Sequence, residues 1–312
     1  MILPPGEPRT KPRALNVALD FCRGDIVGIL DAEDRPDPGQ LTTVAAHLRR
    51  TGPDVAAVQC QLAYFNVREN WITRCFQIEY AIWFDVLLRG WQRLGLPIPL
   101  GGTSVYFRRS ALVELGGWDA HNVTEDADLG MRIARAGLHC DVVGSTTHEE
   151  ANCRFTPWIR QRSRWLKGFM VTYAVHMRQP RVLLSEIGAY KFWGFQVFFI
   201  CALSQFLLAP VLWSFWLVPF GVSHPVATVL GTSATTALAV LFILCEVSAM
   251  IIASYAVRGR AHRHLMAWVP TLALYFPMAT LAAYKAVYEL IRKPFFWDKT
   301  QHGHSLNGGG GD

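Results

Sequence analysis

The stretch that decides the fold is residues 25–34, "DIVGILDAED", where a run of aliphatic residues leads directly into three carboxylates. The aliphatic part is typical of a buried β-strand at 25–32. A helix at 36–50 and a second strand at 55–65 follow it. Because open α/β sheets bind their ligands at the carboxyl ends of the strands, the acids after this strand are expected to face a ligand.

The alternation of strands and helices continues to the middle of the chain. A helix rich in aromatic residues is expected at 70–89, and a glycine-rich turn with a short strand at 101–110. Another helix starts at Thr124, followed by a strand at 139–144 and a helix at 156–177. This order predicts an α/β domain with a largely parallel sheet.

The second half of the chain has the composition of a membrane domain. Residues 192–245 contain no Asp, Glu, Lys or Arg, and such a length exceeds the ~20 residues that cross a bilayer. Spanning segments are expected at 192–220 and 226–257. A third apolar segment at 265–289 contains Pro270 and Pro277, and we favour a re-entrant segment there. The alternative is four crossings.

These patterns predict three regions: a catalytic domain at 1–180, a transmembrane helical domain at 181–291, and a cytoplasmic C-terminal segment with a disordered tail at 292–312. The net charge is +6, and basic runs flank the apolar segments. Such runs usually lie on the cytoplasmic side of a membrane. We therefore expect a lipid bilayer as partner, and no nucleic acid.

Cysteine usage fits a reducing compartment. The chain has seven cysteines and no C-x-x-C pair. This pattern disfavours a disulfide framework and a zinc site, and fits the cytoplasm.

Three carboxylates crowd the start of the helix in "TEDADLGMRIARAG", residues 124–137. Thr124 is a good N-cap residue, and acids in a first turn interact favourably with the helix dipole. That explanation accounts for one or two acids but does not require three. Whether one of them takes part in chemistry is left open by the local pattern.

A second group of acids follows the first strand. Asp31 and Glu33 are separated by one residue, so in an extended segment their side chains point the same way. Mg²⁺ that bridges phosphates is a natural shared target, because it prefers carboxylate and phosphate oxygens. A solvated turn is the alternative interpretation.

A third group lies on the helix at 156–177. Gln161, Arg164 and Trp165 have i, i+3 and i+4 spacing and share one face. Arg164 offers a planar fork for phosphate, and Trp165 offers a ring on which a sugar can stack. The alternative is a helix at the membrane surface, with Arg and Trp at the interface.

The ordered motifs D-x-[DE], T-E-D and Q-x-x-R-W, followed by membrane spans, resemble those of membrane-bound family 2 glycosyltransferases. This family includes cellulose synthase-like proteins and other polysaccharide synthases. The resemblance covers residues 10–303, and its specific stretches are "KPRALN", "DAEDRPDPGQL", "GGTSVYFRR", "TEDADLGMRIARAG", "HEEA" and "QRSRWLKG".

The resemblance implies a GT-A domain, a Rossmann-like nucleotide-diphospho-sugar transferase fold, followed by transmembrane helices. It implies inverting transfer of a sugar from a nucleotide-sugar donor, usually a UDP-sugar, to a growing polysaccharide or glycan, with Mg²⁺ or Mn²⁺ as cofactor. Subunits of a synthase complex are further expected partners. Transfer of one sugar to a lipid carrier, or a catalytically silent remnant or scaffold, are the alternatives.

Site residues follow from the same resemblance. Asp126 matches the general base, with Thr124 and Glu125 in the same motif, and Asp31 and Glu33 match the metal-binding motif. Asp128 has no assigned role and is expected to be a first-turn or surface acid. Residues expected near the diphosphate and acceptor are Gln161, Arg162, Arg164, Trp165, Gly102, Thr103 and Ser104. Residues expected near the nucleotide are Lys11, Asn16 and Asp31.

Two further expectations concern the ends of the chain. Family members begin their GT-A domain with a further strand, helix and strand, so the resemblance implies a domain truncated at its N-terminus. The stretch "WDKTQHG", residues 297–303, is similar to a C-terminal segment that returns to the site. The protein is expected to be an integral multi-pass protein of the inner or plasma membrane, with a cytoplasmic catalytic domain.

Overall fold

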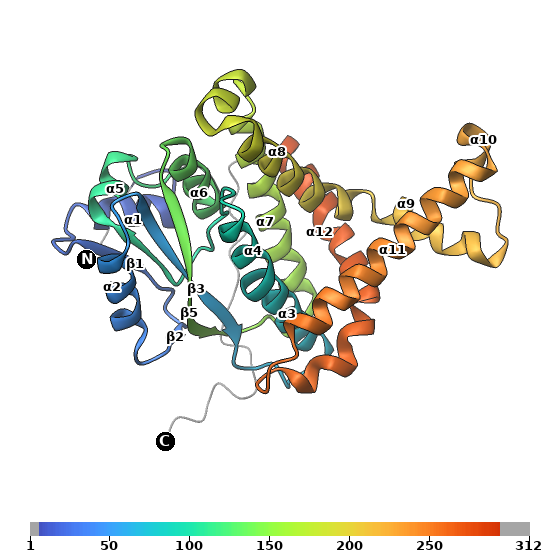
Figure 1. The fold of residues 1–312 in the computed structure, drawn as a ribbon, viewed down its shortest axis with the longest axis horizontal. Helices are drawn as coiled ribbons and strands as arrows, with labels where there is room; N and C mark the ends of the chain where they lie inside the picture. Colours follow the sequence, from blue (N-terminus) through green and yellow to red (C-terminus); the bar gives the residue numbers. More distant parts are fainter. Residues whose placement is uncertain (1–5, 294–312) are drawn as a thin grey trace.

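The computed structural model describes residues 6–293 and contains a sheet domain joined to a group of long helices (Figure 1). The sheet has the strand order β1-β4-β3-β5-β2. The strands are β1 (Ile26–Ile29), β2 (Arg35–Pro36), β3 (Val55–Tyr64), β4 (Val105–Arg108) and β5 (His139–Glu149). The predicted α/β class, followed by apolar helices, is confirmed.

The sheet is mixed, so the prediction of a largely parallel sheet is wrong. β3 and β5 are parallel, whereas β4 lies between β1 and β3 and runs antiparallel to both. The short β2 pairs antiparallel with the end of β5. A four-residue apolar segment identifies a strand but carries no information about its direction, which explains the error for β4.

Helices cover both faces of the sheet. In the first half they are α1 (Lys11–Leu19), α2 (Gln40–Arg50), α3 (Trp71–Tyr80), α4 (Leu88–Arg93), α5 (Arg109–Glu114), α6 (Glu125–Arg135) and α7 (Phe155–His176). A π-helical segment, η1 (Ala81–Leu87), joins α3 to α4. The sequence did not predict α1 and α5.

The local sequence explains where two of these helices begin and end. Asn70 and Thr73 form a capping box at the start of α3, each side chain bonded to the main chain of the other. Gly137 has a φ of +76°, a left-handed conformation that favours glycine, just after α6. The ends predicted for these two helices near 70 and 137 are therefore confirmed.

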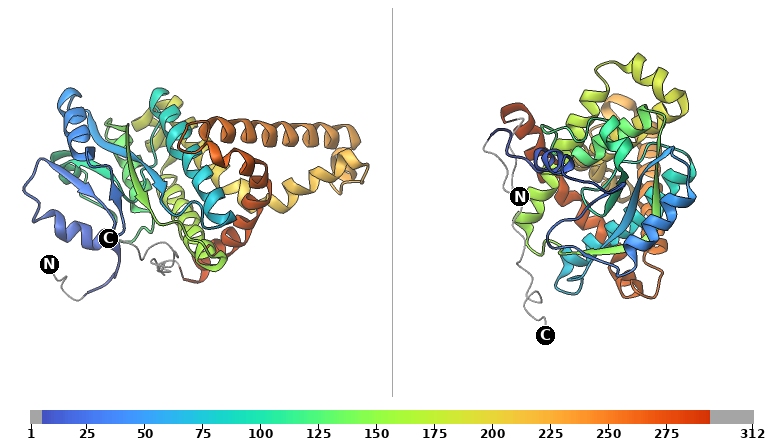
Figure 2. Two further views of the ribbon diagram at one scale, coloured as in Figure 1. Left: turned by 90° about the horizontal axis from the view of Figure 1, so that it is seen from below. Right: turned by 90° about the vertical axis from the view of Figure 1, so that its left-hand side faces the viewer.

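The second half is helical. Its elements are α8 (Pro180–Leu207), α9 (Ala209–Ser214), η2 (Phe215–Phe220), α10 (Ala227–Leu230), α11 (Thr232–Ala256), η3 (Arg263–Thr271) and α12 (Leu272–Arg292). Figure 1 and the left view of Figure 2 show α10 and α11 extending away from the sheet.

Within residues 6–293, three helical stretches are long and apolar enough to cross a membrane: Pro180–Leu207, Thr232–Ala256 and Arg263–Arg292. Pro270 and Pro277 lie inside the third stretch, which continues through both prolines. The stretch changes from the 3₁₀ helix η3 to the α-helix α12 just after Pro270, and the re-entrant segment stays a prediction. The number of crossings stays a prediction, and the predicted segment at 297–303 lies outside the described residues.

The third stretch is also part of the protein core. Tyr275, Ala279, Ala282 and Ala286 of α12 are fully buried in one cluster with residues of α3 and α7, including Phe76 and Trp158. Alanines on this face leave room for close approach between helices. The last apolar helix is thus packed directly against the helix that carries the Q-x-x-R-W motif.

Candidate active site

The acids after β1 lie in a turn rather than an extended segment. The Asp34 N–H donates to the Asp31 carbonyl oxygen at 3.1 Å, and the Asp34 carboxylate accepts from the Asp31 N–H at 2.7 Å. The geometric argument that placed Asp31 and Glu33 on one face of a strand is therefore wrong. An aspartate that bonds its own neighbouring main chain competes with strand formation and favours such a turn.

Lys11 connects this turn to the loop before β4. Its ammonium group pairs with the Asp31 carboxylate and donates to the Gly102 carbonyl oxygen at 2.8 Å. Burial by itself would lower the pKa of Lys11, but the Asp31 carboxylate outweighs that effect and raises it. Helix α1, which begins at Lys11, therefore places a cation beside the acids.

Asn16 holds the main chain of another loop. Its amide nitrogen donates to the Trp118 carbonyl at 2.7 Å, and its amide oxygen accepts from the Trp118 N–H at 2.8 Å. Both ends of the side chain are thus used within the protein. Asn16 ties α1 to the loop that leads into α6.

The loop at 101–104 is held by buried hydrogen bonds. Gln59 of β3 accepts from the Gly101 N–H at 2.8 Å and donates to the Thr103 carbonyl at 3.1 Å. The Thr103 hydroxyl donates to Asp34, and the fully buried Ser104 hydroxyl lies 2.6 Å from that of Thr147. These two predicted site residues hold the loop in place through their side chains.

Asp126 and Glu125 begin α6 beside this loop. The Asp126 Oδ1 atom accepts from the Ala127 N–H at 2.8 Å, and a Cβ built on Gly102 would lie 3.0 Å from Asp126 Oδ2. Burial raises the pKa of both carboxylates, and the Lys11 ammonium partly offsets this. The base predicted from sequence and the Lys11–Asp31 pair are thus brought together.

Thr124 occupies the N-cap position, but its side chain makes no capping hydrogen bond, so that expectation is wrong. Instead, the Asn122 side chain accepts from the Thr124 N–H at 3.0 Å. The Thr124 side chain faces Gly168 of α7, where an added Cβ would come within 2.3 Å of its methyl carbon. Close packing against α7 therefore takes the place of the cap.

Asp128 lies in the first turn of α6, which was one of the two positions expected for it, but it is buried and not a surface acid. It accepts from Arg132 Nε at 2.8 Å and lies 3.1 Å from His176 Nε2 of α7. Burial alone would raise the pKa of Asp128, but the bond from His176 and the charge of Arg132 outweigh burial and lower it. This carboxylate ties α6 to α7.

The α7 motif presents two different faces. Gln161 is buried and accepts from Asn152 Nδ2 at 2.9 Å, while Arg164 and Trp165 are half-buried. Arg162 is buried and forms a two-pronged pair with Glu79 of α3. Arg162 was predicted to lie near a diphosphate, but its side chain forms an interior ion pair instead.

Two carboxylates that sequence analysis did not assign lie near the predicted metal motif. Asp34 Oδ1 and Glu149 Oε1 are buried and have no hydrogen-bond partner within residues 6–293. Burial raises the pKa of each, and Asp31 and Glu33 raise both further. Glu149 belongs to the quoted "HEEA" stretch, and Asp34 follows the metal motif directly, so both signals were present in the sequence.

No three His, Cys, Asp or Glu side chains within residues 6–293 are grouped closely enough to hold a metal ion by themselves. Asp31 and Glu33 are oxygen donors of the kind that Mg²⁺ and Mn²⁺ prefer. Together with the unpaired Asp34 and Glu149 oxygens, they form an acidic region that fits a divalent cation carried in with a diphosphate.

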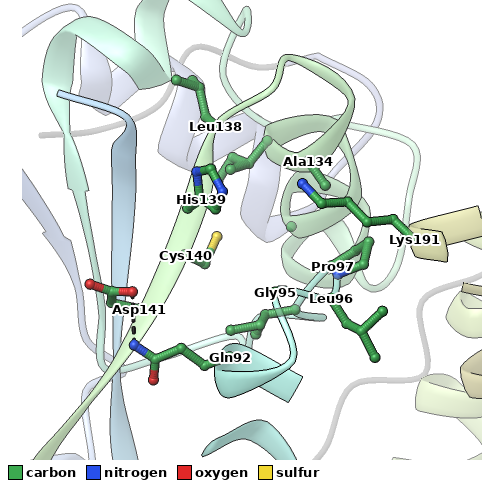
Figure 3. Close-up of a pocket in the computed structure, with 13 residues that line it drawn as sticks. Gln92, Gly95, Leu96, Pro97, Ala134, Leu138, His139, Cys140, Asp141 and Lys191 are labelled. Carbon is green, nitrogen blue, oxygen red and sulfur yellow. Dashed lines mark hydrogen bonds between the residues drawn. The ribbon is translucent and has the colours of Figure 1, made fainter. Parts of the chain in front are cut away.

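A small cavity of about 50 Å³ lies elsewhere, at the amino end of β5 (Figure 3). It is lined by His139, Cys140 and Asp141 together with Gly130 of α6 and Lys191 of α8. The turn at 31–34 leads into β2, which pairs with the opposite end of β5, at His148. The cavity is therefore separate from the predicted site.

The comparisons with known proteins identify the family of the chain. The family described as "Glycosyl transferase family group 2" matches residues 26–284. The chain is 28% identical over 194 residues to a Beta-monoglucosyldiacylglycerol synthase from Trichormus variabilis (strain ATCC 29413 / PCC 7937), which covers 61% of this chain and 40% of the relative. It is 28% identical over 145 residues to Probable glucomannan 4-beta-mannosyltransferase 1 from Arabidopsis thaliana, covering 46% and 26%.

A solved structure similar to this one is the "Mannosyltransferase PcManGT from Pyrobaculum calidifontis in complex with GDP-Man and Mn2+". The TM-score is 0.49 at 21% sequence identity, and the match covers 91% of this chain and 68% of that one. The matched part spans 40% of the length of the cyanobacterial relative. Because the family match runs through the sheet, the site and most of the apolar helices, the chain belongs to Glycosyl transferase family group 2.

Proposed function

We propose that this chain is an inverting glycosyltransferase that moves a sugar from a nucleotide-sugar donor to an acceptor at the membrane, with Asp126 as general base. The observation that carries this proposal is the position of the Asp126 carboxylate, next to Gly102 and near the Lys11–Asp31 pair. A base and a diphosphate-binding region must lie side by side, because the bond that forms and the bond that breaks share one carbon.

In the proposed reaction, Asp126 takes the proton of an acceptor hydroxyl group, and the hydroxyl oxygen forms a bond to the anomeric carbon. The bond from that carbon to the diphosphate breaks, and its electron pair leaves with the nucleoside diphosphate. A single displacement of this kind inverts the anomeric configuration. The amino end of α6 favours the ionised form of Asp126, which the base requires.

For the donor, we assign the diphosphate to the region between Lys11 and the turn at 31–34. Asp31 and Glu33 would hold Mg²⁺ or Mn²⁺, which neutralises charge on the departing diphosphate when it is bound. Lys11 supplies a fixed positive charge beside it. Arg164, with its planar fork, is the second proposed phosphate contact.

For the acceptor, Gln161 and Trp165 of α7 are the proposed contacts, because an indole ring can stack on a sugar. Trp165 packs against Phe76, with ring centroids 5.9 Å apart, and stays half-buried. Two acceptor classes are proposed in order. A growing polysaccharide or glycan is the first candidate. A membrane lipid is the second candidate, because the relative from Trichormus variabilis is named a Beta-monoglucosyldiacylglycerol synthase.

The membrane placement is part of the proposal. Three stretches long enough to span a bilayer, with basic residues around them, support a multi-pass protein whose catalytic domain faces the cytoplasm. Such a placement would bring the site next to lipid-linked or extruded acceptors. Subunits of a synthase complex are further proposed partners.

The test uses membranes that contain the full chain and a panel of radiolabelled UDP- and GDP-hexoses. Label that appears in ethanol-insoluble material indicates a polysaccharide, and label in an organic extract indicates a lipid. The product should lose its label to a glycosidase specific for the inverted configuration. Absence of transfer from every donor, with correct membrane insertion, would favour the silent scaffold instead.

A further inference from the structure

A buried polar cluster joins α12 to α7, the helix that carries the Q-x-x-R-W motif. Tyr275 of α12 is fully buried. Its hydroxyl oxygen accepts from Trp158 Nε1 at 2.9 Å and from Arg162 Nη2 at 3.2 Å, and its hydroxyl group donates to Glu79 at 2.9 Å. One hydroxyl group thus contacts two helices of the first half of the chain, α3 and α7.

The cluster encloses a buried charge that has little freedom to move. The Arg162 guanidinium lies over the rings of Trp158, Trp165 and Tyr275, at 4.6, 5.7 and 5.8 Å from their centroids. Glu79 neutralises it through two hydrogen bonds. A buried ion pair of this kind is costly to disturb, so it favours one relative placement of the helices that share it.

A second contact fixes the register of the same two helices. Lys167 Nζ of α7 lies 3.4 Å from the Glu289 carboxylate of α12, and both side chains are buried. Glu289 also pairs with Lys285 one turn earlier. Trp158 and Arg162 of α7 contact Tyr275, and Lys167, later in α7, contacts Glu289, later in α12. The two helices therefore run side by side in the same direction and are joined at two points.

The later turns of α7 contact the residues around the start of α6. Asn122 Nδ2 donates to the Thr172 hydroxyl at 2.9 Å, and His176 bonds Asp128. Gly168 of α7 packs against Thr124, as described above. Helix α7 therefore contacts both α12 and α6, whose first turn carries Asp126.

We propose that Tyr275 is a positioning residue: through Trp158, Arg162 and Glu79 it sets the placement of α7, and thereby of Trp165 and of the first turn of α6 with Asp126. This inference rests on the proposed glycosyl transfer. If Tyr275 has this role, α12 influences the geometry of the site and is not only a membrane anchor. The main part of the proposed donor region, at α1, β1 and the 101–104 loop, has no contact with the cluster among the bonds described, and only Arg164 belongs to α7. Loss of the Tyr275 hydroxyl should therefore affect donor binding less than turnover.

The kinetic test compares Tyr275→Phe, which removes only the hydroxyl group, with Tyr288→Phe on the same helix, where the side chain is 61% exposed. Loss of the hydroxyl leaves the buried Trp158 N–H without an acceptor and loosens α7. Displacement by a fraction of an ångström should lower kcat by about 10–100-fold. The KM for the donor should change less than kcat, because Arg164 is the one proposed donor contact on α7, and Tyr288→Phe should leave both parameters unchanged.

A wild-type kcat in Tyr275→Phe would overturn the inference. Equal losses of kcat and nucleotide affinity would also overturn it, since they would indicate general loosening. The cluster predicts in addition that the two variants Tyr275→Phe and Trp158→Phe are not additive, because each removes the same hydrogen bond. Additive losses in kcat would contradict the proposed contact.

A readout independent of transfer uses Cys75, which is buried in α3 with its Sγ atom 3.5 Å from the Thr271 hydroxyl. Loosening of α12 should expose this thiol, so its labelling by a maleimide should be about tenfold faster in Tyr275→Phe. Labelling at the wild-type rate would overturn the inference even if the wild-type protein transfers no sugar. Absence of transfer by the wild type would count against the proposed function alone.

Discussion

Gly102 and Asp126 face each other so closely that a Cβ on Gly102 would lie 3.0 Å from the Asp126 Oδ2 atom. The carboxylate therefore lies against the main chain of the loop whose carbonyl oxygen also accepts from Lys11. A glycine here keeps one side of the carboxylate free of side-chain atoms. This relationship links the proposed base to the proposed diphosphate region through one residue.

The first prediction concerns the proposed base. Asp126→Asn keeps the size of the side chain but removes its proton-accepting charge, so transfer should fall about 10²–10⁴-fold. Binding of UDP or GDP, measured by titration calorimetry, should be retained because Asp126 does not hold the diphosphate. Glu114→Gln, at the exposed end of α5, is the matched control and should leave the rate of transfer unchanged. Wild-type turnover in Asp126→Asn would require another base.

The second prediction concerns the pH dependence of transfer. Burial raises the pKa of Asp126 and Glu125, so the ionised base should be lost at a higher pH than for an exposed aspartate, whose pKa is ~3.9. The Lys11 ammonium acts in the opposite direction. Lys11→Met should therefore move the acid limb of the kcat profile to higher pH, whereas Lys191→Met on α8 should leave it in place. An acid limb that shifts downward in Lys11→Met would contradict this electrostatic picture.

The sequence predicted the parts of the site that depend on local pattern. The strand that leads to the acids at 31–34, the start of α6 at 124–125 and the helix with Gln161, Arg164 and Trp165 follow from hydrophobic periodicity and motif spacing. Periodicity determines which residues share a face, because it reflects the geometry of a single element.

The parts that failed depend on contacts between distant elements. Arg162 shares the motif with Arg164, yet its partner Glu79 stands 83 residues earlier in the chain. The expected cap at Thr124 is replaced by packing against Gly168, and Asp128, expected to be a first-turn or surface acid, is covered by His176. Spacing within one helix contains no information about which element will pack against it.

The third prediction concerns the metal. If Asp31 and Glu33 hold a divalent cation against the diphosphate, excess chelator should abolish transfer, and Mg²⁺ or Mn²⁺ should restore it. Asp31→Asn should lower the affinity for Mn²⁺ in the presence of UDP or GDP, measured by the electron paramagnetic resonance signal of free Mn²⁺. Asp54→Asn, an exposed acid before β3, serves as control. Full activity in chelator would contradict the metal assignment.

The fourth prediction concerns stability at Asp128. Asp128→Asn breaks a buried contact with Arg132 and His176, so it should lower the free energy of unfolding by about 3 kcal/mol. The folded-state pKa of Asp128 is lowered. Its contribution to stability is therefore present above the unfolded pKa of ~3.9, and is lost as the pH falls through the folded pKa.

Urea unfolding in detergent, followed by tryptophan fluorescence at several pH values, measures both effects. The difference between wild type and Asp128→Asn should be constant near neutral pH and should shrink in acid. A stability difference that grows as the pH falls would contradict the lowered pKa of Asp128. Transfer by the variant should fall in proportion to the folded fraction, in contrast to Asp126→Asn.

The last prediction uses two helical glycines with opposite surroundings. A Cβ on Gly130 of α6 would lie 2.1 Å from the Ile98 carbonyl oxygen, a main-chain atom that has little room to move, whereas a Cβ on Gly90 of α4 would meet nothing within 4 Å. Gly130→Ala should lower the free energy of unfolding by about 1–3 kcal/mol through overpacking. Gly90→Ala should raise it by up to ~1 kcal/mol, because alanine is the better helix former.

The Gly130 site also tests how firmly α6 is tied to the loop that faces Asp126. Residues 98–100 lead directly into Gly101 and Gly102, so a displacement at Ile98 should move the loop away from the carboxylate. Gly130→Ala should therefore lower kcat for transfer in the molecules that remain folded, while Gly90→Ala leaves kcat unchanged. Equal kcat values for the two folded variants would mean that the loop and the base are positioned independently of α6 packing, by Gln59 and Lys11 alone.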